Sequence, residues 1–584
     1  MNNDNKNFIL FALFAALILF GWPLVTSKFF PAANPPVTKI ENGKSKTIAN
    51  PGASPAATSA SAVRDRKVVL AESPRVLIDT PELKGSINLK GARVDDLVLV
   101  KYKETIDKNS PPIRLLSPSG TKDAYFAGFG WSGDGISVPG PDTVFAASAQ
   151  VLSPGKPVTL AWANPTGQKF VIRLSIDDRF MFTVDQAVFN GGTAAVKAAP
   201  YALVSRAGPG ADVDTWTNHV GPIGTFGSGT TYDITYDNLH GKEPSFFAKI
   251  FGNSGRPGEN YFDTTGGWAG FGDKYWLAAV IPDQKAAVHS GFRASAPGAN
   301  FQADVSRASV SIAPGGQMFT TTHLFTGAKE VNTLDRYEDN LHIPHFGNAI
   351  DWGWFSVVEK PIFKYLDWLF RMVGNFGVAI ILLTLTIRGL MFPIAQRQFA
   401  SMANMRAIQP KMKALQEKHK DDKPRQQQEI MALYKAEKVN PLAGCLPTFL
   451  QIPVFYALYK VLLLTIEMRH QPFVLWIKDL SAPDPATVLN LFGYLHFTLP
   501  HFLAIGVIPV LLGISMYFQF KLNPAPMDEA QKQVFAIMPW VLMFVMAPFA
   551  VGLQIYWITS NTLTILQQRL LYARHPGMKV AAVK

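Results

Sequence analysis

The sequence predicts a mixed fold: an α-helical polytopic membrane protein with six spans, joined to one large antiparallel β-sandwich outside the membrane. Two properties of the 584 residues predict this combination of an apolar and a water-exposed part. Hydrophobic residues make up 48% and charged residues only 17%, against about 25% charged residues in soluble domains. Mean hydropathy is nevertheless only +0.10, so a large water-exposed part must dilute the apolar segments. The single cysteine, Cys445, excludes an intrachain disulfide.

The net charge of +12 permits a nucleic-acid partner, but no basic run is interleaved with aromatic residues that would stack on bases. Anionic lipid headgroups and basic loops on the inner side of a membrane explain the excess more simply. We therefore expect contact with membrane lipids and no sequence-specific binding of nucleic acid.

The first apolar segment, Phe8 to Val25, carries no charge and approaches the length that spans the ~30 Å hydrocarbon core. A cleavable signal peptide is the alternative. No clear cleavage site follows the segment, and Lys6 is the only basic residue before it, which favours a retained transmembrane signal anchor over residues 1–27. Residues 28–75 are rich in Pro, Ala, Ser and Lys without apolar periodicity, so they predict a flexible linker.

Residues 76–340 have the alternating pattern of strands. From Phe170 to Ile176, apolar residues occupy every second position, and Gly, Asn, Asp and Pro separate such runs throughout. A large antiparallel sandwich fits this pattern best.

Long apolar segments resume near residue 373. Three of them predict single spans: 373–395, 445–466 and 501–520. The stretch 534–568 contains no Asp, Glu, Lys or Arg across 35 residues, and as one helix it would measure about 52 Å, far more than a membrane. We therefore expect a tight hairpin near Pro548 and Gly552, which divides the stretch into two short spans. Residues 445–571 thus supply four of the six spans.

The basic residues of the loops predict the orientation. Ten Lys and Arg lie between residues 396 and 444, and only two lie between 467 and 500, so the 396–444 loop is expected in the cytoplasm. Its two helical patterns, separated by residues 421–424, predict a cytoplasmic helical hairpin. Both termini, including the short basic tail 572–584, then lie in the cytoplasm and the β-domain lies outside. Residues 350–372 are amphipathic and Trp-rich, which predicts a helix in the outer interface.

Arg388 places a charged side chain within the predicted second span, where a charge is unfavourable. It follows eight apolar or Thr residues, and a guanidinium keeps its charge at any relevant pH, so it requires water, a counter-charge or both. The alternative is that it extends to the cytoplasmic headgroups. Thr384, one turn earlier, favours a polar surface that faces the other helices. Because no acid lies in a span near Arg388, the substrate is expected to supply the missing charge.

Other polar or soft side chains are further candidates for contact with a substrate. In the last span, polar residues at i, i+3 and i+4 spacing predict either contacts between helices or one side of a groove; Gln451 in the third span has the same two interpretations. These candidates are Gln554, Trp557, Asn561 and Gln451. In the hairpin, the methionines have two interpretations: they form the seam between the two helices, or they form a soft surface that contacts hydrophobic substrate segments or the ribosome. These methionines are Met402, Met405, Met412 and Met431.

Motifs for chemistry are absent from the sequence. Gly43-Lys44-Ser45 lacks the leading glycine of a P-loop, and there is no H-E-x-x-H or G-x-S-x-G motif. We expect no catalytic residue, no metal and no cofactor, and therefore no enzyme.

Several strings together resemble one family closely. They are Thr386 to Pro393, Ala432 to Leu442, Trp476 to Ser481, and Ser560-Asn561 followed by Gln567-Gln568. These strings are similar to those of the YidC/Oxa1/Alb3 family of membrane protein insertases, in particular the Gram-negative type. The resemblance implies a protein of the bacterial inner membrane with a β-supersandwich domain in the periplasm. It also implies a five-helix core with a hydrated groove that opens to the cytoplasm and to lipid.

The resemblance also implies roles for individual residues. Arg388 matches the family's groove arginine, Thr384 its substrate-facing threonine, and Trp557 an aromatic contact that is often tyrosine. The last hairpin, Pro548 to Leu553, departs from the commoner Pro-Ser-Gly-Leu pattern. The implied partners are nascent membrane proteins, the Sec translocon and the ribosome; the 396–444 and 521–533 loops are the candidate ribosome contacts because the tail is short.

The function expected from this resemblance is that of a membrane protein insertase and chaperone, acting alone or with the translocon. A polytopic solute transporter is one alternative, which would need an acidic partner for Arg388 and a path to the outside. A membrane-tethered carbohydrate-processing protein is another, because this type of sandwich also occurs in sugar-processing proteins. The sequence offers no convincing pair of catalytic carboxylates for it.

Overall fold

A computed structural model describes residues 64–210, 212, 218–227, 229–242, 257–294, 300–396, 408–419, 422–437, 446–487, 505–522 and 529–574. The chain divides into a β-rich unit, which ends at Asp351 and also includes Leu464–Ile466, and a helical unit that contains the other described residues from Trp352 onward. Several predictions lie outside the described residues: the anchor 1–27, the linker up to residue 63, Met402, Met405, Cys445 and residues 575–584 of the tail.

The β-rich unit begins earlier than the sequence pattern predicts. Helix α2 (Arg66–Ala71) lies within the predicted linker 28–75, and strand β1 (Arg75–Asp79) begins at the last residue of that linker. The Asp65 side chain caps α2 by accepting a hydrogen bond from the Lys67 amide at 2.8 Å. A helix of six residues has too few turns to reveal an apolar period.

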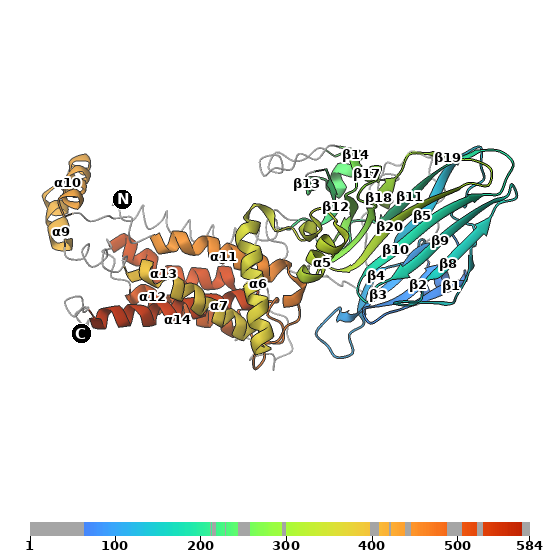
Figure 1. Cartoon of the computed structure of the whole chain (residues 1–584). Coiled ribbons are helices and arrows are strands. Elements are labelled where there is room, and N and C mark those ends of the chain that lie inside the picture. Colours follow the sequence, from blue (N-terminus) through green and yellow to red (C-terminus); the bar gives the residue numbers. More distant parts are fainter. Residues whose placement is uncertain are drawn as a thin grey trace, which may run out of the picture. The chain divides into compact units, whose positions relative to one another are not determined.

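Two sheets form this unit (Figure 1). Within the described residues, the first sheet has eleven strands in the order β14-β17-β18-β11-β5-β3-β2-β1-β7, with β19 on β11 and β4 on β3. Beyond β1, these strands are β2 (Leu83–Asn88), β3 (Arg93–Lys103), β4 (Pro112–Leu116), β5 (Tyr125–Asp134), β7 (Val151–Leu152), β11 (Val196–Ala207), β14 (Asn260–Thr265), β17 (Ala287–Ala294), β18 (Asn300–Ser306) and β19 (Val310–Ile312).

The second sheet has nine described strands in the order β13-β12-β15-β16-β20-β10-β9-β8-β6. They are β6 (Ala146–Ala147), β8 (Val158–Ala163), β9 (Gln168–Ile176), β10 (Met181–Asn190), β12 (Gly221–Phe226), β13 (Gly229–Thr231), β15 (Trp268–Gly272), β16 (Trp276–Pro282) and β20 (Gln317–Ala328). Neighbouring strands run antiparallel in both sheets, apart from the parallel pair β1–β7. Strands β16 and β18 of the two sheets contact each other, so the expected large antiparallel sandwich is confirmed.

The alternation in β9 is confirmed residue by residue. Phe170, Ile172, Leu174 and Ile176 are all buried, and Phe170 packs edge-on against Trp131 of β5 with the ring centroids 5.1 Å apart. Because successive side chains of a strand point to opposite faces, one face of β9 makes the core between the sheets.

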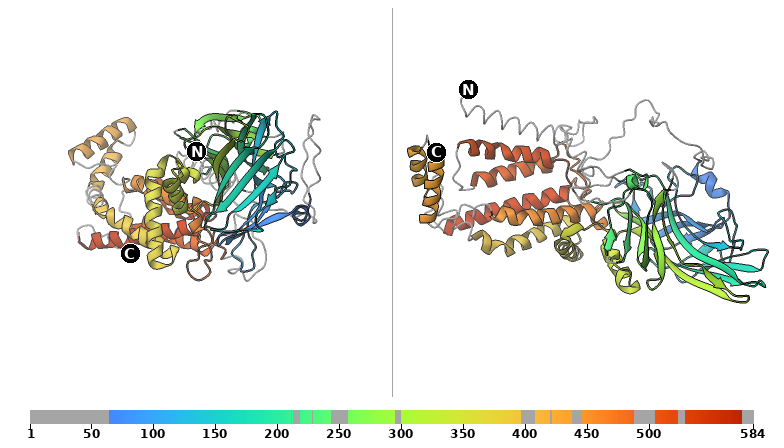
Figure 2. Two further views of the ribbon diagram at one scale, coloured as in Figure 1. Left: turned by 45° about the vertical axis from the view of Figure 1, so that its right-hand side comes forward. Right: turned by 90° about the horizontal axis from the view of Figure 1, so that it is seen from above.

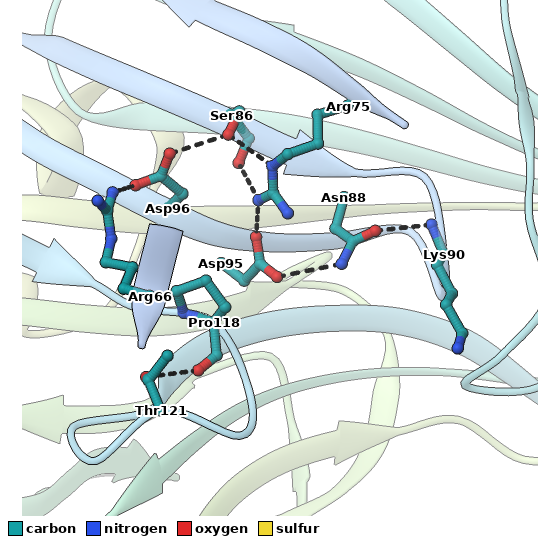
Figure 3. A network of polar contacts seen from close by, with 9 residues as sticks. All are labelled: Arg66, Arg75, Ser86, Asn88, Lys90, Asp95, Asp96, Pro118 and Thr121. Carbon is teal, nitrogen blue, oxygen red and sulfur yellow. Dashed lines mark hydrogen bonds and ion pairs between the residues drawn. The ribbon is translucent and has the colours of Figure 1, made fainter. Parts of the chain in front are cut away.

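A buried ionic network fixes the start of this unit (Figure 3). Arg66 of α2 pairs with Asp96, and Arg75 of β1 pairs with Asp95. Ser86 of β2 links both pairs: its hydroxyl accepts from Arg75 Nε at 2.7 Å and donates to Asp96 Oδ2 at 2.9 Å. The register of β2 on β3 shifts after Ser86, and such a bulge lets two consecutive aspartates join one network.

The end of the unit folds back onto its second sheet. After α5 (Val331–Leu341), three side chains donate hydrogen bonds to carbonyls of the segment 344–349, which contains the 3₁₀ turn η2 (Phe346–Ala349). Lys329 Nζ donates to the Ala349 carbonyl at 3.1 Å, the Tyr232 hydroxyl to Asn348 at 2.7 Å, and Trp268 Nε1 to Pro344 at 3.2 Å. The β-rich unit therefore extends beyond the predicted residue 340.

The helical unit contains the long helices of the second half. They are α6 (Ser356–Val373), α7 (Phe376–Leu390), α9 (Gln409–Lys418), α10 (Lys423–Ala436), α11 (Leu446–Leu464), α12 (Val507–Leu522), α13 (Glu529–Met546) and α14 (Val551–Arg574). Helix α14 packs against α7 and α12, and α12 packs against α13. Helix α6 runs across the direction that these helices share (Figures 1 and 2).

Local signals in the sequence set the ends of several helices. Gly374 takes a left-handed conformation, φ 69°, at the end of α6, and Asn375 then caps α7 by accepting from the Val378 amide at 3.1 Å. The predicted turn at Pro548 is confirmed, because α13 ends at Met546 and α14 begins at Val551. In the described part of the chain, no helix combines the length and the hydropathy needed to cross a membrane.

Candidate functional site

Arg388 lies near the end of α7 and its guanidinium faces α14. Nε donates to the hydroxyl oxygen of Ser560 at 2.9 Å, and Nη2 donates to the same oxygen. Ser560 is only 2% exposed, so the charged group points at the buried side of α14. In the described part of the chain, the hydrogen bonds of Arg388 are to a neutral oxygen and not to a carboxylate.

Two further polar side chains surround this contact. Tyr556 lies one turn before Ser560 on α14, is 2% exposed, and is near enough to Arg388 for an electrostatic interaction. Its hydroxyl accepts a hydrogen bond from Gln451 Nε2 of α11. We call Arg388, Ser560, Tyr556 and Gln451 the Arg388 cluster; three helices contribute to it.

The cluster contains a buried acceptor without a described partner. The amide oxygen Oε1 of Gln451 is buried and makes no hydrogen bond among the described residues. A buried polar atom of this kind is satisfied by water or by a bound group. The cluster therefore has the polar character that a wet interior requires.

Thr384 lies on the same helix but has a different role here. It is 1% exposed, and its hydroxyl donates to the carbonyl of Ile380 at 2.6 Å. The hydroxyl is thus used within α7 and takes no part in the hydrogen bonds of the Arg388 cluster.

Trp557 lies beside the cluster on the seam between α14 and α11. Its ring is half-buried and packs edge-on against Phe455, with the centroids 5.0 Å apart. Phe455 lies one turn after Gln451 on α11, so Trp557 and the Arg388 cluster share this seam.

Gln554 and Asn561 connect helices. Gln554 is fully buried, and its amide donates to the carbonyls of Met546 and Phe549, each at 2.9 Å. It thereby caps the end of α13, where carbonyl groups lack partners within the helix. Asn561 donates to the Ser515 hydroxyl of α12 at 2.9 Å. These two contacts match the interpretation of polar contacts between helices.

Sequence reasoning missed Ser560 and Tyr556. Both lie at i, i+4 spacing on α14, and Thr564 continues the row by donating to the Ser560 carbonyl at 2.8 Å. The spacing was visible in the sequence, but it does not tell which of several neighbouring polar rows faces α7.

A loop closes the end of the bundle that lies away from Arg388. We call residues 471–487 the cap loop. The amides of Val551 and Gly552 donate to the carbonyls of Ala482 and Leu480, each at 2.9 Å, and Asn375 Nδ2 donates to the Phe473 carbonyl at 3.0 Å. The loop therefore covers the first turns of α7 and α14, about 18 Å along α7 from Arg388.

Asp484 ties the cap loop to a third helix. Its carboxylate accepts from the amide of Ile508 at 2.8 Å, in the first turn of α12, and from Trp476 Nε1 at 3.0 Å. A carboxylate at a helix start is favourable because free amides point at it. The loop is thus bound to α7, α12 and α14.

In the hairpin, the two described methionines differ. Met412 of α9 is half-buried and its sulfur accepts from the Tyr434 hydroxyl of α10 at 3.2 Å, whereas Met431 is 54% exposed. Lys411 and Glu437 add an ion pair at 2.6 Å. Met412 therefore lies in the hairpin seam and Met431 lies outside it. No three His, Cys, Asp or Glu side chains gather as a metal site in the part of the chain described here.

Two family models match two successive parts of the chain. The model described as YidC periplasmic domain matches residues 75–365, and the model described as 60Kd inner membrane protein matches residues 368–578. The chain is therefore an inner-membrane protein with a periplasmic β-domain.

Curated relatives match along nearly the whole chain. Membrane protein insertase YidC of Zymomonas mobilis subsp. mobilis is 46% identical over 574 residues, which cover 98% of this chain and 96% of the relative. The protein of the same name from Methylobacterium nodulans is 44% identical over 599 residues, covering 99% and 96%. The chain belongs to the YidC family of membrane protein insertases, and the prediction of a non-enzymatic insertase is confirmed.

Among solved structures, an active YidC insertase crystal structure with the first transmembrane domain resolved is similar at 17% identity. The match covers 85% of this chain and 92% of that chain, with a TM-score of 0.36. The family assignment rests on the sequence matches. It sets aside the alternatives of a solute transporter and a carbohydrate-processing protein.

Proposed function

We propose that this insertase receives nascent membrane proteins in a hydrated groove at the Arg388 cluster, which opens to the cytoplasm and to lipid. The observation that supports the proposal most is the position of the guanidinium: it faces α14 and is hydrogen-bonded to the neutral oxygen of Ser560. A neutral acceptor satisfies N–H groups but leaves the charge uncompensated.

An uncompensated guanidinium has two physical consequences. It retains water, because removing water from a permanent charge is costly. It also attracts carboxylates, and the acidic outer stretch of a nascent chain supplies them. Water in the inner half of the bilayer lowers the desolvation cost of the polar backbone that has to cross it.

Closure at the other end gives the pathway its direction. The cap loop is hydrogen-bonded to the first turns of α7 and α14, which favours entry from the end that holds Arg388. The apolar segment of the substrate then leaves sideways, driven by burial of about 20 residues in lipid. This step needs no nucleotide.

For the membrane arrangement we propose six spans, with both termini in the cytoplasm. Helices α7, α11, α12, α13 and α14 are the second to sixth spans, and α6 lies in the outer interface. The basic 396–444 loop supports this orientation. Helices of only 15 and 16 residues, α7 and α12, fit a locally thin bilayer.

We also propose three kinds of partner besides the nascent chain: the Sec translocon, the ribosome and membrane lipids. The exposed Met431 of the hairpin supports a soft contact surface on the cytoplasmic side. The exposed Val357 and Trp368 of α6 support contact with lipid.

Replacement of Arg388 by Ala tests the groove. In cells depleted of the native insertase, Arg388→Ala should reduce insertion of a single-span substrate with an acidic outer end by about tenfold, because it removes an interaction with a charged group worth about 1.5 kcal/mol. The same substrate with Asn and Gln in place of its acids should be affected much less. Arg371→Ala is the matched control, because Arg371 is an exposed arginine of α6 paired with Asp367 at 2.8 Å. Equal insertion by the wild type and Arg388→Ala would reject the groove.

A further inference from the structure

One small hydroxyl holds the guanidinium of Arg388. Ser560 Oγ accepts from both Nε and Nη2, which are two N–H groups on the same edge of the guanidinium. Two bonds from one planar group to one oxygen fix the plane as well as the position of the charge. Thr564 bonds to the backbone carbonyl of Ser560 at 2.8 Å, so its contact does not compete for that hydroxyl oxygen.

Without such an acceptor, the Arg388 side chain can adopt an outward orientation instead. It lies two residues before the end of α7, where Leu390 is 76% exposed. A long arginine side chain near a helix end readily extends to the headgroups when nothing holds it inside. Ser560 is thus the described contact that distinguishes an inward guanidinium from an outward one.

The chemistry of the acceptor matters as much as its place. A serine oxygen is neutral, whereas a carboxylate would form a shorter and stronger charge-assisted bond with the guanidinium. A serine therefore orients the charge without cancelling it, and an incoming carboxylate can displace the serine. Ser560 is itself only 2% exposed, so bulk water does not satisfy its hydroxyl oxygen.

We propose that Ser560 is a positioning residue, which holds the guanidinium of Arg388 inside the bundle and so makes the insertase prefer substrates with acidic outer ends. This inference rests on the proposed groove. It assigns Ser560 no contact with the substrate.

The test measures a preference and not the total activity. The experiment compares two single-span substrates: the outer end of one carries Asp and Glu, and the outer end of the other carries Asn and Gln at the same positions. For each full-length variant at matched protein level, we measure the insertion of the acidic substrate divided by that of the neutral one. Ser560→Ala and Ser560→Gly should lower this ratio to about the value of Arg388→Ala. Ser560→Thr retains a hydroxyl and should keep the wild-type ratio.

A control and a double variant separate positioning from a structural role. Thr562 lies on the same helix, is exposed, and its hydroxyl bonds to the Ile558 carbonyl at 2.8 Å, so Thr562→Ala should leave the ratio unchanged. Ser560→Ala should have no further effect in an Arg388→Ala background, because positioning acts only through Arg388.

The outcomes are distinguishable. If Arg388→Ala lowers the ratio but Ser560→Ala and Ser560→Gly do not, the positioning role is wrong and the groove stands. If the double variant inserts less than Arg388→Ala alone, Ser560 acts on structure and the positioning role is again wrong. If Arg388→Ala itself leaves the ratio unchanged, the proposed groove fails first.

Discussion

At the scale of single residues, Lys329 gives the β-domain a pH dependence. It directly follows β20, is only 2% exposed, and its ammonium donates to the Ala349 carbonyl at 3.1 Å. Burial lowers the pKa of Lys329 to about 8, and nearby acids such as Asp273 only partly oppose this. Unfolded lysine has a pKa of about 10.4, so between these values the unfolded chain binds the proton that the folded chain does not.

The sign of the effect follows from that difference. Stability of the β-domain should rise from pH 8 to pH 10, by up to about 3 kcal/mol. Above pH 10 the trend reverses, because burial raises the pKa of Tyr125 and Tyr337, and unfolded tyrosines then lose protons that folded ones keep. Thermal unfolding of the full chain in detergent checks this. Lys329→Met should lack the rise between pH 8 and 10, and an equal rise in both proteins would show that Lys329 is not its cause.

Some residues of the candidate site can be predicted from the sequence, and others cannot. Arg388 is evident because a permanent charge in an apolar run needs a physical explanation. Ser560 is not, because serine is ordinary in a helix and only the rotation of α14 against α7 decides that it meets the guanidinium. Gln554 was expected beside the groove as one of two interpretations, and instead caps α13.

At the scale of elements, the contact between α7 and the cap loop depends on one glycine. A side-chain carbon at Gly377 would lie 2.0 Å from the ring of Phe473, whereas nothing lies within 4 Å of such a carbon at Gly389. Gly377→Ala should therefore displace the cap loop at a cost of about 1–3 kcal/mol. Gly389→Ala on the same helix is the matched control.

Cysteine labelling measures that displacement. Val474, which is 47% exposed in the cap loop, is replaced by Cys in a Cys445→Ser background, and its labelling rate in purified protein is followed. Gly377→Ala should change the rate and increase protease sensitivity of residues 471–487, and Gly389→Ala should not. Identical behaviour of the two variants would mean that close packing at Gly377 does not hold the loop.

Elements with a long or repeated pattern were predictable. The alternation in β9 and the hairpin turn at Pro548 both follow from local rules about side-chain period and proline. Helix α2 was not predictable, because it is only six residues long and is secured by the ion pair between Arg66 and Asp96, which are far apart in the sequence. The cap loop also has no repeating pattern, and its fixed shape comes from Asp484 and from amides of other helices.

At the scale of the whole molecule, composition separates two parts before any motif is considered. A low charged fraction together with a mean hydropathy near zero requires one apolar and one water-exposed region. The two family models also match two successive parts of the chain, which meet between residues 365 and 368, within α6. What composition cannot give is the pairing order of the strands, since β11 joins β5 and β18 across long sequence separations. That order depends on tertiary packing.

The claim that substrates pass beside the Arg388 cluster is tested most directly by photocrosslinking to a stalled nascent chain. A photoreactive residue at Trp557, on the seam with α11, should crosslink to the transmembrane segment of the substrate, and Arg388→Ala should weaken that crosslink. A photoreactive residue at Leu511, which is 44% exposed on α12, is the control and should crosslink much less. Equal or stronger crosslinking from Leu511, unaffected by Arg388→Ala, would contradict the claim.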